Sequence, residues 1–131
     1  MLFRSGGPKR QALLTNRLQA AAKVPLLVAM DAEWGLDMRL DSSAHYAKQM
    51  TLGAMDDPQY VYQMGHDMAR KLRALGVHIN FAPVIDVNSN PGNPVIGNRS
   101  FGEDPERVAK LGIQYIKGLQ DSRLKIGRAH V

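Results

Sequence analysis

Hydrophobic residues recur with two different periods along this chain, and the two periods alternate. Over residues 8–22, 58–75 and 104–119 they return every three or four positions, which is typical of amphipathic helices. Between these segments lie two continuous apolar runs, "KVPLLVAMD" and "VHINFAPVID". Uninterrupted runs of this length fit strands that are buried on both faces. The pattern therefore predicts helices that alternate with buried strands.

Polar residues at the helix ends strengthen the prediction. Asp57-Pro58 and Asp104-Pro105 each combine a capping carboxylate with a proline suited to the first turn, and Gly76 is placed to end the second helix. Pro83 restricts regular strand pairing to the first half of "VHINFAPVID". The stripes expected to be buried are Leu13, Leu14, Leu18 and Ala21 in the first helix, Val61, Met64, Met68, Leu72 and Leu75 in the second, and Val108, Leu111, Tyr115, Ile116 and Leu119 in the third.

The order of elements predicts an α/β fold with a parallel sheet. Leu2-Phe3 reads as the stub of an earlier strand, which gives strand–helix–strand–helix–strand–helix. A doubly wound sheet would usually carry a G-x-G-x-x-G turn after a strand, and the sequence has none. Instead Asp31 and Asp86 end the two clear strands and open long polar loops. Because a (β/α)8 barrel builds its site at these strand ends, the barrel is favoured.

Composition narrows the function classes. With 131 residues, 44% hydrophobic and 22% charged, the chain fits one globular domain, and its zero cysteines exclude disulfides. The apolar stretches are too short to span a membrane, and no secretory signal is visible. The net charge of +5 comes from scattered lysines and arginines, so we expect no nucleic-acid binding. His66 and His78 lack partners at ligand spacing, so we expect no metal ion or other cofactor.

Two polar clusters follow the predicted strands. Carboxylates and guanidinium groups grip vicinal hydroxyls through charge-assisted hydrogen bonds, and an aromatic ring covers the apolar face of a sugar. A purely structural role stays open for several of these residues. Asp31 would then cap a turn or neutralise Arg39, and Asp86 would form the loop. Trp34 would belong to the core, and Glu33 and Asp37 would be solvated or structural. The first cluster is Asp31, Glu33, Trp34, Asp37 and Arg39, and the second is Asp86, Asn88, Asn90, Asn98 and Arg99.

Long motifs in these clusters resemble a known family. "PLLVAMDAEWGLDMRL", "AKQMTLGAM" and "LGVHINFAPVIDVNSNPGNPVIGNRSFGEDPE" are similar to the N-terminal barrel domain of glycoside hydrolase family 3, in particular its bacterial β-N-acetylhexosaminidase branch. The resemblance covers residues 2–122. It implies a (β/α)8 barrel and hydrolysis of terminal non-reducing β-linked sugars with retention of configuration.

The resemblance also implies roles for individual residues. Asp31, Arg39 and Arg99 correspond to substrate-binding positions of the family. The pattern of the two clusters, rather than the resemblance, makes Trp34 and Asp86 candidate sugar contacts. A carbohydrate is thus the expected partner, while the oligomeric state stays open. So does the compartment, with a periplasmic or secreted parent enzyme as one alternative.

The catalytic motifs of the family are not found in these residues. Retaining hydrolysis needs a carboxylate nucleophile and a general acid. The branch carries a Lys-His-Phe-Pro-Gly-His-Gly motif, a His–Asp pair and an aspartate nucleophile further along its chain. A full barrel takes about 250 residues. We therefore expect residues 1–122 to be about half of a barrel that has no catalytic residues and no activity.

Two alternatives to a β-N-acetylhexosaminidase fragment remain: a β-glucosidase fragment and a non-catalytic carbohydrate-binding module. The end of the chain carries a separate expectation. Residues 126–131, "IGRAHV", match the translation of a common sequencing-adapter sequence, so we expect them to be a non-native tail rather than a natural basic one.

Overall fold

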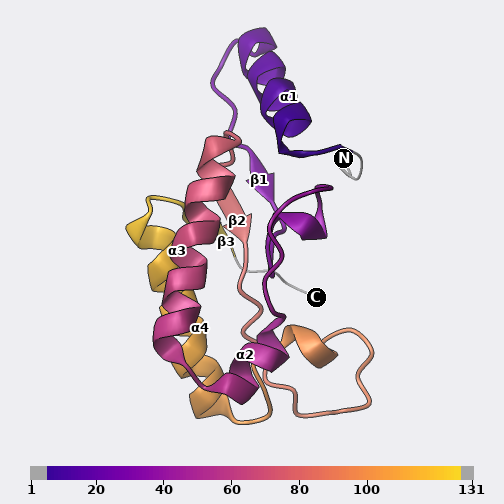
Figure 1. Cartoon of the computed structure of the whole chain (residues 1–131), viewed down its shortest axis with the longest axis vertical. Helices are drawn as coiled ribbons and strands as arrows, with labels where there is room; N and C mark the ends of the chain where they lie inside the picture. The colour runs from indigo at the N-terminus through magenta and orange to yellow at the C-terminus, as the bar shows by residue number, and fades with distance from the viewer. Residues whose placement is uncertain (1–5, 128–131) are drawn as a thin grey trace.

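Three short parallel strands in sequential order form the centre of the structure (Figure 1). The structure is a computed structural model that describes residues 6–127. Strand β1 (Ala29–Met30) pairs with β2 (Ile79–Phe81), which pairs with β3 (Lys125–Gly127). Met30, Asn80 and Ile126 lie side by side across the sheet. The predicted α/β fold with a parallel sheet is confirmed.

Helices connect the strands of this sheet. Helices α2 (Gln49–Met55) and α3 (Pro58–Ala74) connect β1 to β2, and α4 (Pro105–Asp121) connects β2 to β3. Figure 1 shows α3 and α4 side by side along one flank of the strands. Consecutive parallel strands joined through helices are the arrangement of βαβ units.

The predicted helix caps are confirmed. The Asp57 carboxylate accepts a hydrogen bond of 3.0 Å from the backbone N–H of Tyr60, and that of Asp104 accepts one of 3.0 Å from Glu106. Pro58 and Pro105 occupy the first turns, where a missing N–H costs nothing. These local signals place both helix starts.

The stripes of the second and third predicted helices form the core. Their residues are at most 6% exposed, with Ile116 half-buried as the exception. Tyr115 and Phe101 are the largest fully buried side chains. Helix α2 and the 3₁₀ turns η1 (Leu36–Met38) and η2 (Gly97–Arg99) were not predicted.

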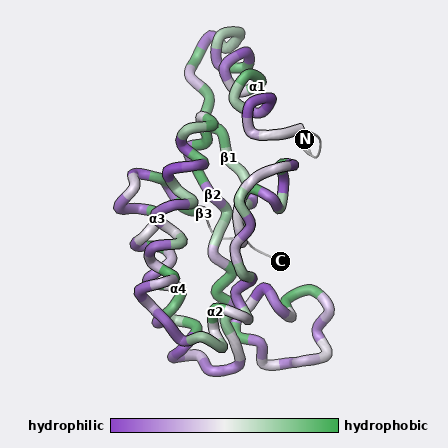
Figure 2. The backbone as a smooth tube through the Cα atoms, in the orientation of Figure 1, coloured by the Kyte–Doolittle hydropathy of each residue, from purple (hydrophilic) through white to green (hydrophobic). Residues whose placement is uncertain are grey.

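The first helix forms as predicted, but its stripe is not buried. Helix α1 (Pro8–Ala21) lies at one end of the long axis (Figure 1) and alternates hydrophilic and hydrophobic residues (Figure 2). Leu13 is 56% exposed and Leu18 is 39% exposed, whereas Gln11 and Thr15 are buried. The periodicity identifies the apolar face of a helix. Burial of that face also requires another part of the protein to pack against it.

The expectation for the apolar run "KVPLLVAMD" before and within β1 was wrong for the same reason. Only Ala29 and Met30 pair in the ladder, while Val24 is 73% exposed and Leu27 is 67% exposed. A strand buried on both faces over this whole run was the wrong expectation. Within residues 6–127 no helix is both long and apolar enough to cross a membrane.

Both ends of the sequence carried expectations that fall partly outside the described residues. The strand stub at residues 2–3 lies outside them, as do residues 128–131 of the expected tail. Ile126 and Gly127 of that tail belong to β3, where they pair with Asn80 and Phe81.

Helices α3 and α4 approach closely because two glycines lie at their contact. A Cβ atom on Gly118 would lie 2.2 Å from the carbonyl oxygen of Tyr62 and 2.8 Å from the backbone nitrogen of His66. A Cβ on Gly65 would lie 2.7 Å from the carbonyl oxygen of Tyr115. Since both obstacles are backbone atoms, a larger residue at either position would push the helices apart.

We therefore expect Gly118→Ala to lower the free energy of unfolding by about 2 kcal/mol or more, as overpacking does. Gly112→Ala in the same helix is the matched control: its Cβ would meet only the Ile85 side chain at 3.2 Å, and Ile85 is 42% exposed. Alanine adds similar helix propensity at both positions. Urea unfolding measures both; equal stability of the two variants would contradict the close-approach account.

Candidate functional site

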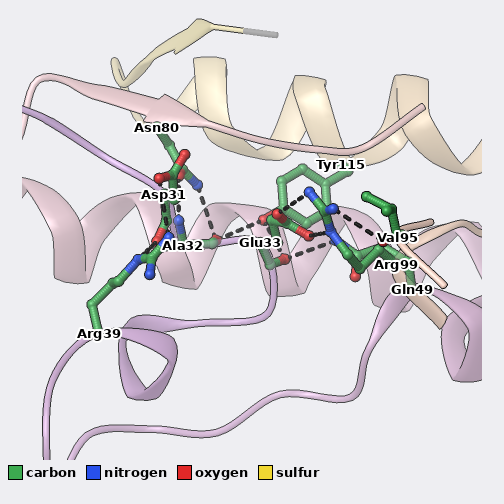
Figure 3. A network of polar contacts seen from close by, with 9 residues as sticks. All are labelled: Asp31, Ala32, Glu33, Arg39, Gln49, Asn80, Val95, Arg99 and Tyr115. Carbon is green, nitrogen blue, oxygen red and sulfur yellow. Dashed lines mark hydrogen bonds and ion pairs between the residues drawn. The ribbon is translucent and has the colours of Figure 1, made fainter. Parts of the chain in front are cut away.

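Two loops bring the predicted site residues together at the carboxyl ends of neighbouring strands. The segment 31–48 follows β1, and the segment 82–104 follows β2. Because β1 and β2 are parallel and adjacent, both segments begin at the same edge of the sheet. Figure 3 shows the side chains of Asp31, Glu33, Arg39 and Arg99 in one network there. The structure thus brings together residues that are up to 68 positions apart in the sequence.

Asp31 and Arg39 form the outer pair of this network. The Arg39 guanidinium donates from Nη2 to the Asp31 carboxylate at 3.0 Å, and from Nε to the Asp31 carbonyl oxygen at 3.0 Å. The Asp31 side chain is 47% exposed, whereas that of Arg39 is 18% exposed. One edge of the guanidinium is therefore fixed, and the carboxylate stays accessible to a ligand.

Glu33 and Arg99 form the inner pair, which is a bidentate ion pair. Arg99 donates from Nε to one carboxylate oxygen at 3.0 Å and from Nη2 to the other at 2.8 Å. The Glu33 side chain is only 3% exposed. Glu33 is thus structural rather than solvated, and its partner lies in the other loop, which sequence reasoning missed.

The charge of Arg99 is secured by its surroundings. Its hydrogen bonds to Glu33 raise the pKa of the guanidinium, against burial, and the negative charges of Asp86 and Asp31 raise it further. Arg99 also donates from Nη1 to the carbonyl oxygen of Val95 at 3.2 Å. The site therefore holds a fixed cation among three carboxylates.

Buried polar side chains hold the backbone at the beginning of the segment 31–48. The Asn80 amide accepts from the N–H of Ala32 at 3.0 Å and donates to its carbonyl oxygen at 3.2 Å. The Tyr115 hydroxyl lies 3.0 Å from the carbonyl oxygen of Glu33, and Gln49 donates to the same oxygen at 3.1 Å. Burial raises the pKa of Tyr115, so its hydroxyl stays a donor. In the sequence, this network could have been suspected from Asn80, a polar residue inside an otherwise apolar strand.

Trp34 and Asp86 lie in the same loops without joining the two ion pairs. The ammonium of Lys48 sits 4.8 Å from the centre of the Trp34 ring, and the Trp34 carbonyl oxygen accepts from Tyr46 at 3.2 Å. The Asp86 carbonyl oxygen accepts from the Ser100 hydroxyl at 2.6 Å. One face of the indole is thus occupied by a cation.

The carboxylates of this network are paired with guanidinium groups. Across residues 6–127, no group of three or more His, Cys, Asp or Glu side chains is arranged to hold a metal. The carboxylates of Asp31 and Glu33 are each matched by a guanidinium. Paired charges of this kind form directed, charge-assisted hydrogen bonds.

Comparison with known proteins finds one matching family model and several similar sequences. A family model described as "Glycosyl hydrolase family 3 N terminal domain" matches residues 8–130. The chain is 39% identical over 117 residues to a beta-hexosaminidase A of Pseudoalteromonas piscicida, covering 82% of this chain and 20% of that protein. It is 32% identical over 119 residues to a beta-N-acetylglucosaminidase/beta-glucosidase of Cellulomonas fimi, covering 91% of this chain and 21% of that protein.

A solved structure agrees with these sequence relatives. The glycoside hydrolase family 3 beta-N-acetylglucosaminidase of Paenibacillus sp. str. FPU-7 superposes with a TM-score of 0.88 at 41% identity, covering 95% of this chain and 25% of that chain. The chain thus spans about a fifth to a quarter of the length of these three proteins.

The burial of Glu33 leads to a prediction about stability. Arg99→Ala leaves a buried carboxylate without its partner, so we expect it to lower the free energy of unfolding by about 3 kcal/mol. Arg39→Ala is the control, because Asp31 is half-exposed and is re-solvated, and we expect a loss below about 1 kcal/mol. Chemical denaturation of both variants compares them. Equal losses would mean that the Glu33–Arg99 pair is no more structural than its exposed neighbour.

Proposed function

The chain belongs to glycosyl hydrolase family 3, and on that premise we propose that its two loops form the sugar-binding part of a β-N-acetylhexosaminidase. In this proposal Asp31, Arg39 and Arg99 bind the hydroxyl groups of a terminal, non-reducing, β-linked N-acetylhexosamine. The observation that carries it is the convergence of these three side chains, from two loops, at one strand edge (Figure 3). The names of the similar proteins support the substrate class.

The hydrogen-bonding capacity of the two arginines supports the grip on hydroxyls. A guanidinium carries five N–H donors. Arg39 uses Nε and Nη2 on Asp31, and its Nη1 has no partner within residues 6–127. Arg99 uses one N–H each of Nε, Nη1 and Nη2, which leaves two. Both arginines therefore keep donors for sugar oxygens, while the half-exposed Asp31 accepts from sugar hydroxyls.

We propose that this part of the protein orients the sugar and that the bond-breaking groups lie elsewhere in the parent enzyme. Retaining hydrolysis needs a free carboxylate nucleophile and a second carboxyl or imidazole group as general acid. The Glu33 carboxylate is buried and fully engaged by Arg99, and that of Asp31 is paired with Arg39. Neither is suited to attack an anomeric carbon, so we expect the isolated chain to bind but not to hydrolyse.

We further propose that the sheet is part of a (β/α)8 barrel. The sequential order of β1, β2 and β3, with α3 and α4 on one side, supports it. A β-glucosidase specificity is the second candidate, favoured by the double name of the Cellulomonas fimi relative. A non-catalytic carbohydrate-binding module is the third candidate, and it would bind the sugar through the same residues without hydrolysing it.

Sugar binding can be followed directly, because Trp34 is the single tryptophan of the chain and lies next to Glu33. We expect methyl N-acetyl-β-D-glucosaminide to change its fluorescence saturably, and methyl β-D-glucoside to do so more weakly. Arg39→Ala should weaken binding about tenfold, the size of a lost charge-assisted hydrogen bond. Arg17→Ala, an exposed arginine on the distant helix α1, should leave binding unchanged.

The outcomes separate the candidates. Stronger binding of the glucoside would favour the β-glucosidase specificity, and no response to either sugar would contradict the sugar grip. Nitrophenyl β-N-acetylglucosaminide tests turnover in the same samples. Turnover that survives purification and disappears in Asp31→Ala would contradict the division between binding and bond-breaking groups.

A further inference from the structure

The loop that carries Asp31 and Arg39 folds back on itself at Tyr46. The backbone N–H of Tyr46 donates to the carbonyl oxygen of Trp34 at 3.2 Å. The Tyr46 ring packs against Gly35, where an added Cβ would lie 2.8 Å from Tyr46 Cδ2. Gly35 has φ of +121°, which a side chain would also disfavour. Tyr46 thus closes the segment 31–48 near its beginning.

The hydroxyl of Tyr46 ties this closure to helix α3. It donates to the Asp67 carboxylate and accepts from the Lys71 ammonium at 2.7 Å, and Lys71 also donates to Asp67 at 2.6 Å. Burial and the hydrogen bond to Asp67 raise the pKa of Tyr46. The hydroxyl therefore stays protonated near neutral pH and remains a donor.

The other polar contacts of the returning half stay within the loop or reach the segment before α1. Asp41 accepts from the N–H of Gly6 at 3.1 Å, Ser43 donates to the Leu40 carbonyl oxygen, and His45 pairs with Asp37. None of these three contacts ties the loop to helix α3.

Leu36 and Leu40 are buried and anchor the first half of the loop in the core. The Asp31–Arg39 pair has a half-exposed carboxylate, and exposed ion pairs stabilise little. In the returning half, residues 41–47 form neither helix nor strand, and Asp41 and Ser42 are exposed.

We propose that Tyr46, held by Asp67 and Lys71, is a positioning residue that fixes the loop 31–48 and thereby the geometry of Asp31 and Arg39. The functional half of this statement rests on the proposed sugar grip. Within residues 6–127 the hydrogen bonds of Tyr46 go to Trp34, Asp67 and Lys71 and to neither arginine, so its effect on a ligand is exerted through the order of the loop. Fixing the loop before the sugar arrives avoids an entropy cost on binding.

The test removes the Tyr46 hydroxyl and keeps its ring. In Tyr46→Phe we expect amide hydrogen exchange in residues 34–46 to rise about fivefold or more, as local opening becomes easier. Tyr62→Phe is the matched control, since the Tyr62 hydroxyl donates to Asp121 at 2.9 Å between α3 and α4, outside the loop. It should leave loop exchange unchanged. Equal loop exchange in Tyr46→Phe and wild type, or an equal rise in both variants, would overturn the proposal.

A second variant and a second readout complete the design. Lys71→Met keeps the side-chain stem and removes one of the two ties on the hydroxyl, so we expect a smaller rise in loop exchange; no rise would count against the tie. Sugar affinity, read from Trp34, should fall in Tyr46→Phe by a similar factor. Unchanged affinity with faster loop exchange would overturn the positioning role. If the wild-type chain binds no sugar, the proposed function fails, and loop exchange still decides whether Tyr46 fixes the loop.

Discussion

The buried carboxylate of Glu33 constrains this structure more than any other single group. It follows β1, it is nearly inaccessible to water, and both its oxygens are bound by Arg99 from the loop after β2. A buried carboxylate without a partner is costly, so the second loop must bring its guanidinium to this position. Once it does, Asp31, Asp86 and Arg39 are gathered around the same strand edge. The ion pair thus joins the segments 31–48 and 82–104, which no strand pairing connects, into one surface.

The layer below explains why the first loop is able to present these groups. Helices α3 and α4 touch backbone to backbone at Gly65 and Gly118, which lets Tyr115 of α4 reach the carbonyl oxygen of Glu33. Asn80 of β2 fixes Ala32 at the same level. The backbone at Ala32 and Glu33 is therefore held by buried hydrogen bonds. Such a preformed surface suits our proposal of a sugar grip, because little ordering is left to occur on binding.

Helix caps could be predicted from the sequence, whereas contacts between distant segments could not. Asp57-Pro58 and Asp104-Pro105 marked the helix starts, because a cap is satisfied by its own next residues. The Glu33–Arg99 pair could not be predicted, because its members are 66 positions apart and either residue alone looks like a surface charge. The leucines of α1 show the converse limit, since an apolar stripe does not reveal whether anything covers it. Asp31, Arg39 and Arg99 stood out as members of two polar clusters after the predicted strands, and their sugar-binding roles, which remain a proposal, came from the family resemblance.

A double-mutant cycle on Glu33 and Arg99 tests the central constraint most directly. Glu33→Gln, Arg99→Met and the double variant would be unfolded in urea beside the wild-type chain, and the coupling free energy taken from the four stabilities. Because each single change strands one member of a buried pair, we predict a coupling of about 2 kcal/mol or more, with the double variant more stable than Arg99→Met alone. Additive losses, with no coupling beyond about 0.5 kcal/mol, would show that the two loops are assembled by something other than this ion pair.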